Sequence, residues 1–178
     1  MLDNEELHRL ADSLPANGEP SYPDRMRVRA AVAAELPRLE ELCARRGYRA
    51  WQAMFPNDNE PMELLERALR NPADPELPTA LNFLHTKLDD VLGIGPEAFT
   101  ATYAGFACMI TARHAVAGSI TDPNSAGGEI EIPPDEWSPC FLTSLVEAGG
   151  ATWEDGTDTA ARRAYWRWYL LEAIASLC

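Results

Sequence analysis

Residues 96–117 read PEAFTATYAGFACMITARHAVA, and this stretch decides the fold. It has no charged residue from position 99 to position 112, which makes it the least polar segment of its length in the chain. Its large side chains recur at the spacing of one helical face: Phe99, Tyr103, Phe106 and Ile110. The other faces carry small residues, alanines and Gly105, which allow neighbours to pack closely, and Pro96 suits a first helical turn. We therefore predict a helix over 96–117 at the centre of a helical bundle.

Apolar residues at helical spacing predict further helices on both sides of this one. The predicted ranges are 2–14, 24–46, 62–69, 79–92, 136–148 and 158–177, with 48–55 as either a short helix or an irregular segment. Pro37 should kink or divide the helix 24–46, and Thr79 should cap the helix 79–92. The loop 118–134 contains one alternating segment, 129–132, and one strand alone cannot form a sheet. The predicted fold class is all-α: a single-domain multi-helix bundle over 1–178, with long loops and at most one short strand or hairpin.

An acidic block covers residues 115–161, which contain no Lys, Arg or His but nine carboxylates. These acids repel one another unless water or cations from elsewhere in the fold screen them. Bulky apolar residues are interleaved with the acids, which a merely solvated face does not need. A solvated face that aids solubility remains the alternative, but the interleaving favours a docking surface for a basic partner.

The candidate binding residues are the acids and the apolar anchors of this block. They are Asp122, Glu129, Ile130, Glu131, Ile132, Asp135, Glu136, Trp137, Trp153, Glu154 and Asp155.

The net charge of −13 argues against DNA or RNA as a direct ligand, because phosphate binding needs a basic face. The amino terminus has neither the basic nor the apolar region of a secretory signal. No uncharged run reaches the roughly 20 residues of a membrane span. We expect a cytoplasmic protein without membrane association. The four cysteines form no Cys-x-x-Cys pair, so we expect reduced thiols packed as small hydrophobic residues.

The last predicted helix carries four aromatic residues in five positions, Tyr165, Trp166, Trp168 and Tyr169, which cannot all share one face. One interpretation is a helix docked into the core, with Arg162, Arg163 and Arg167 meeting the acids that precede it. The other is an exposed Trp or Tyr anchor.

A metal-binding or enzymatic alternative uses His85, Asp89 and His114. His85 and Asp89 lie one helical turn apart, which resembles a helical metal site. A simple hydrogen bond between them explains the same residues. The chain has no nucleophile in a recognisable turn and no phosphate-binding glycine loop, so we expect a protein without enzymatic activity or cofactor.

Four segments resemble the fifth family of immunity proteins of bacterial polymorphic toxin systems. They are FLxxKLD at 83–89, YAGFA at 103–107, AGGAxWE at 148–154 and RRxYWxWYLxEA at 162–173. The resemblance covers the chain from about residue 51 onward. It implies a cytoplasmic antidote that binds the catalytic domain of a cognate toxin and blocks it without doing chemistry. No catalytic residue carries over from the family.

The acidic block agrees with this resemblance independently. Toxins that act on nucleic acid need a basic cleft, which a carboxylate-rich inhibitor can occupy as a phosphate mimic. A third alternative is an obligate homodimer in which exposed aromatic residues meet their own copies.

Overall fold

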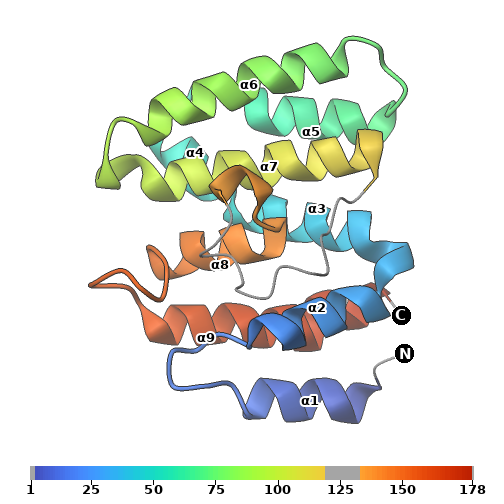
Figure 1. Ribbon diagram of the computed structural model, residues 1–178, viewed down its shortest axis with the longest axis vertical. Coiled ribbons are helices and arrows are strands. Elements are labelled where there is room, and N and C mark those ends of the chain that lie inside the picture. Colours follow the sequence, from blue (N-terminus) through green and yellow to red (C-terminus); the bar gives the residue numbers. More distant parts are fainter. Residues whose placement is uncertain (1–2, 119–132, 178) are drawn as a thin grey trace.

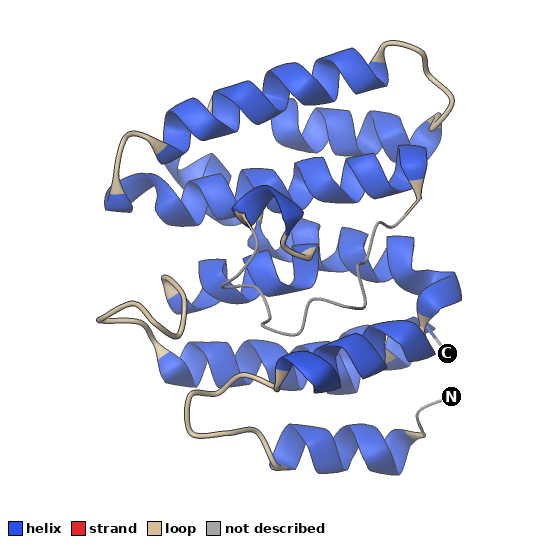
Figure 2. Ribbon diagram, in the orientation of Figure 1, coloured by secondary structure: helices blue, strands red, loops and turns tan. Residues whose placement is uncertain are grey.

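The computed structural model describes residues 3–118 and 133–177, whose helices are stacked in layers (Figure 1). In chain order the elements are α1 (Asn4–Asp12), α2 (Tyr22–Ala31), η1 (Ala33–Glu35), α3 (Leu36–Gly47), α4 (Arg49–Met54), α5 (Glu60–Arg70), α6 (Leu77–Leu92), η2 (Pro96–Ala98), α7 (Phe99–Ala117), η4 (Pro134–Glu136), α8 (Pro139–Ala148), α9 (Thr159–Trp168), η5 (Tyr169–Ala173) and η6 (Ala175–Leu177). η5 is a π-helical continuation of α9, and the other η elements are short 3₁₀ turns. The described residues contain no strand (Figure 2), and the all-α prediction is confirmed.

Helix α7 forms the centre of the molecule, as predicted. It packs against α3, α4, α5, α6 and α8, and its residues 101–112 are buried on every side. Gly105 makes this close approach possible, because a Cβ atom there would overlap Leu88 of α6 and would lie 3.2 Å from the ring of Trp51. The helix is therefore apolar all round because neighbours surround it.

One helix boundary at a proline was predicted and another was not. The segment 24–46 is divided before Pro37, as predicted, because a proline is tolerated in the first turn of α3 but not in a helix interior. Helix α6 begins at Leu77 with Pro78 in its first turn, so Thr79 lies inside the helix and the predicted cap is wrong. The predicted strand at 129–132 lies outside the described residues.

Helix α1 lies at one edge of the stack and α6 lies at the opposite edge (Figure 1).

Arginines of α9 hold the N-terminal segment through its backbone. Arg163 donates hydrogen bonds to the carbonyl oxygens of Leu14 and Pro15, and Arg167 donates to the carbonyl oxygen of Ala11 at 3.0 Å. The prediction that these arginines meet the acids just before them holds in part for Arg162, on which Glu154 and Asp158 act electrostatically, but not for Arg163 or Arg167.

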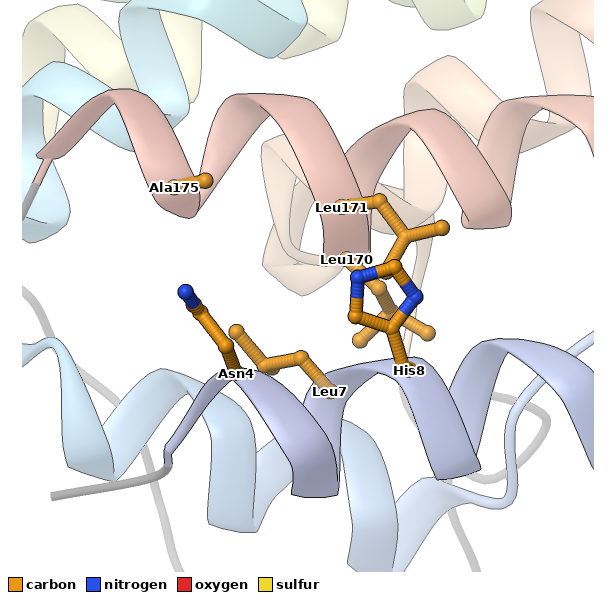
Figure 3. Close-up of a pocket in the computed structure, with 6 residues that line it drawn as sticks. All are labelled: Asn4, Leu7, His8, Leu170, Leu171 and Ala175. Carbon is orange, nitrogen blue, oxygen red and sulfur yellow. The ribbon is translucent and has the colours of Figure 1, made fainter.

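A small cavity of about 80 Å³ lies where α1 packs against the C-terminal helix. Figure 3 shows Asn4, Leu7 and His8 of α1 facing Leu170, Leu171 and Ala175 across it. Pockets that hold metabolites are several times larger, about 300 Å³ or more. Within the described ranges, no helix is long and apolar enough to cross a membrane.

Candidate functional site

Trp137 and Trp153, both candidate anchors, come together in the fold. Their ring centroids lie 6.1 Å apart with the planes at 74°, an edge-to-face contact. Trp137 also lies 5.4 Å from Phe141 and 5.9 Å from Tyr103, whose ring is 6.1 Å from that of Phe99. We call these five rings the aromatic ridge. It connects the start of α7 to the loop between α8 and α9.

The ridge presents one tryptophan to solvent. The side chain of Trp153 is 46% exposed, whereas Trp137 is 6% exposed and Phe141 is buried. A partner that docks on this conformation reaches Trp153 and not Trp137. The buried rings beneath Trp153 limit its motion, so little side-chain entropy would be lost on binding.

Helix caps on both sides hold the two tryptophans in place. Trp137 directly precedes Ser138, whose hydroxyl caps α8 by accepting a hydrogen bond from the amide of Phe141 at 3.2 Å. Helix α8 ends at Gly149 in the left-handed conformation, which favours glycine. Asp158 then caps α9 by accepting from the amide of Ala161 at 2.9 Å. The loop that carries Trp153 is thus fixed at both ends.

Three acids of the acidic block accept hydrogen bonds from other groups of the protein. Glu147 receives hydrogen bonds from Arg46 at 3.2 Å and from Arg49 at 2.7 Å. Glu154 accepts from the amide of Ala151 at 2.6 Å, and Asp158 is the cap already described. Sequence reasoning missed the two arginines, because they lie about 100 positions before Glu147 in the chain.

Two acids of the block remain exposed beside the tryptophans. Glu136 precedes Trp137, Asp155 follows Trp153 by two positions, and neither forms an ion pair within the described residues. We call Trp153, Glu136 and Asp155 the Trp153 face. The remaining candidates lie outside the described part of the chain: Asp122, Glu129, Ile130, Glu131, Ile132 and the side chain of Asp135.

Burial dominates the chemistry beneath this face. Together with the negative charge of Glu154, it raises the pKa of Tyr103 to about 12. The ridge is therefore a dry aromatic support with acids at its edge.

A sequence model of the family described as "Immunity protein Imm5" matches residues 23–176. The chain belongs to the Imm5 family of immunity proteins. The earlier resemblance is confirmed, and the role of the protein is that of an immunity protein, which neutralises a cognate toxin. No curated protein matches the chain. The matched region includes the whole aromatic ridge but not α1.

The aromatic residues of the C-terminal helix in this Imm5 protein serve its core. Tyr165, Trp166 and Tyr169 are buried, and the hydroxyl of Tyr165 donates to the carbonyl of Cys140 at 2.8 Å. Trp168 is partly buried beneath the guanidinium of Arg46, 4.2 Å from the ring centroid. The interpretation of a helix docked into the core fits this arrangement.

The residues of the metal alternative do not come together in this Imm5 protein. His85 lies 3.7 Å from Asp89, but His114 lies 2.6 Å from Glu40, which also accepts from Arg29 at 2.8 Å. Across residues 3–118 and 133–177, no group of three or more His, Cys, Asp or Glu side chains could hold a metal ion. His114 belongs instead to a buried hydrogen-bonded cluster with Glu40 and Arg29, which joins α2, α3 and α7.

The cysteines of this Imm5 protein follow the sequence prediction. Cys43, Cys108 and Cys140 are buried free thiols, and Cys178 lies outside the described residues. Burial raises the pKa of Cys108 to about 12, which keeps that thiol protonated and unreactive at neutral pH.

Proposed function

We propose that this immunity protein neutralises its toxin by covering a basic active-site surface of the toxin with the Trp153 face. The position of Trp153 is the observation that carries this proposal. A half-exposed indole ring held on buried rings is the kind of side chain that contributes most to the binding energy of protein interfaces. The protein acts by occlusion and performs no chemistry.

The charge of the chain supports a basic partner. It has 28 acidic and 15 basic residues, and many of the basic residues are engaged in ion pairs within the protein. The remaining negative potential speeds encounter with a positive surface and slows encounter with a negative one. A toxin that cleaves or modifies nucleic acid has such a positive surface, and carboxylates can occupy its phosphate sites.

The undescribed candidates belong to the same proposal. Asp122, Glu129, Ile130, Glu131 and Ile132 precede Trp137 in the chain and would add acids and apolar contacts to the interface. We place the encounter in the bacterial cytoplasm, where an antidote protects the cell that makes the toxin.

The proposal is tested by titrating the purified protein against the toxin domain encoded beside it. We expect Trp153→Ala to weaken binding about 30-fold or more, as loss of a central aromatic anchor does. The matched control is Phe83→Ala on α6, because Phe83 is also an exposed aromatic, 71% accessible, but lies away from the face. We expect the control to retain wild-type affinity within about threefold.

Salt dependence tests the electrostatic part of the proposal. The association rate should fall as ionic strength rises, because salt screens the attraction between the two surfaces. The proposal fails if the two alanine variants bind equally well. An association rate that does not change with ionic strength would contradict the electrostatic part of the proposal.

A further inference from the structure

The protein repeatedly places a cation between an aromatic ring and a carboxylate. Arg46 lies over Trp168 and donates to Glu147. Arg25 lies over Phe141, 5.0 Å from the ring centroid, and donates to Glu19 at 2.9 Å.

A third example uses the only lysine of the chain. Lys87 lies over Trp51 at 5.6 Å and donates to Glu60 at 2.7 Å. A ring binds a cation through its negative face and the carboxylate adds an ion pair, so each arrangement combines two attractions.

Trp153 offers an exposed ring over which none of the described cations lies. Two exposed acids without ion pairs to described residues are close to it in the chain: Asp155 follows Trp153 by two positions, and Glu136 directly precedes Trp137, whose ring contacts that of Trp153. Among the described residues, no Arg or Lys lies over Trp153, and neither acid is ion-paired. The undescribed segment 119–132 contains no Lys, Arg or His that could fill the position.

We propose that an arginine side chain of the toxin fills this position, stacked on the ring of Trp153 and held by the carboxylates of Asp155 and Glu136. This proposal rests on the proposed function and names the chemistry that the Trp153 face recognises. A guanidinium fits better than an ammonium group, because its planar fork can stack on the indole while its N–H groups donate to carboxylates. Arg46 on Trp168 is the example of this geometry inside the same protein.

The test is a set of double-mutant cycles between the full-length protein and the purified toxin domain. Each exposed arginine of the toxin is replaced in turn by alanine and by lysine, and the dissociation constant is measured against wild type and against Trp153→Leu. We expect one arginine whose replacement by alanine weakens binding about 10-fold to 100-fold against wild type but about threefold or less against Trp153→Leu. Its replacement by lysine should lose most of the same affinity.

Four further variants distinguish loss of the proposed contact from loss of folding. Trp153→Phe retains a ring and should fall between wild type and Trp153→Leu. Asp155→Asn combined with Glu136→Gln should weaken binding about 10-fold, whereas Glu35→Gln, an exposed acid in η1, should not change it. Phe83→Leu should show no coupling to any toxin arginine.

The arginine proposal is overturned if every toxin arginine is additive with Trp153→Leu while wild-type binding is intact. If wild-type protein does not bind the toxin at all, the proposed function itself fails.

Discussion

The C-terminal helix and the aromatic ridge contain similar rings, but they differ in how the outermost ring is covered. In the helix, neighbouring layers bury Tyr165, Trp166 and Tyr169, and Arg46 covers Trp168. In the ridge, the inner rings are buried in the same way, but Trp153 stays half exposed. The difference lies in the cations that lie over the rings: Arg46 of α3 lies over Trp168 and Arg25 of α2 lies over Phe141, but among the described residues no cation lies over Trp153. Exposure of a ring alone does not mark an interface, since Phe83 is 71% exposed; Trp153 differs because its ring rests on the buried rings of Trp137 and Phe141.

The largest expected difference between the two regions is in stability. Trp166→Ala should lower the free energy of unfolding by about 3–5 kcal/mol, because it opens a cavity around a fully buried side chain. Trp153→Ala should cost about 1 kcal/mol, since half of its surface is already in water. Urea unfolding at pH 7 measures both. Equal losses would mean that Trp153 is a core residue and would end the comparison.

The second-largest expected effect is a loss of stability at alkaline pH, because Tyr103 is buried in the ridge. The pKa of Tyr103 is raised to about 12, against about 10 in the unfolded chain, so the folded state favours the protonated phenol. Its contribution to stability is complete below pH 10 and is lost as the pH rises through 12. We expect Tyr103→Phe to remove on the order of 2 kcal/mol of the alkaline decline in stability.

Unfolding measured at several values between pH 9 and pH 12 tests this expectation. Tyr48→Phe is the matched comparison, because burial also raises the pKa of Tyr48 to about 12 but Tyr48 lies outside the ridge. If the free energy of unfolding falls equally with pH in the wild type and in Tyr103→Phe, then Tyr103 has no raised pKa and water reaches its ring.

The smallest effect concerns the cover on Trp168. Arg46→Met keeps an apolar stem but removes the guanidinium from Trp168 and Glu147, while Arg49 still holds the carboxylate. We expect a loss of about 0.5–1 kcal/mol, typical of a partly exposed cation contact. Arg70→Met on α5 is the control, because Arg70 is exposed without an ion pair in the described residues. A change larger than about 2 kcal/mol would mean that Arg46 supports the core.

Much of the fold was predictable because it depends on local patterns. The spacing of Phe99, Tyr103, Phe106 and Ile110 identified the central helix, and Gly93 and Gly149 follow the ends of α6 and α8. The exact starts were less predictable. Pro37 and Pro78 both occupy first turns, and a proline signals a boundary without saying on which side of it the helix lies.

Less of the candidate site was predictable, because its contacts join distant segments. The sequence identified Trp137 and Trp153 separately, but periodicity carries no information that their rings touch. It also missed that Arg46 and Arg49 neutralise Glu147, since an excess of acids in one segment says nothing about cations from another layer. Phe99 and Tyr103 were recognised as core residues of a helix and not as the far end of the ridge.

Arg163 and Arg167 hold the N-terminal segment by donating hydrogen bonds to its backbone carbonyl oxygens, which every amino acid provides. Evolution can therefore rewrite most side chains of this segment without loosening it, in keeping with its position outside the family match. Gly18 is an exception: its φ is +79°, and a Cβ atom would lie 2.7 Å from the carbonyl oxygen of Thr159. Leu7, Ala11 and Leu14 are the others, because they are buried in the core. Asp12 and Glu6 also form ion pairs, with Arg167 and Arg27, so relatives should vary most at the exposed positions of this segment that form no such contact.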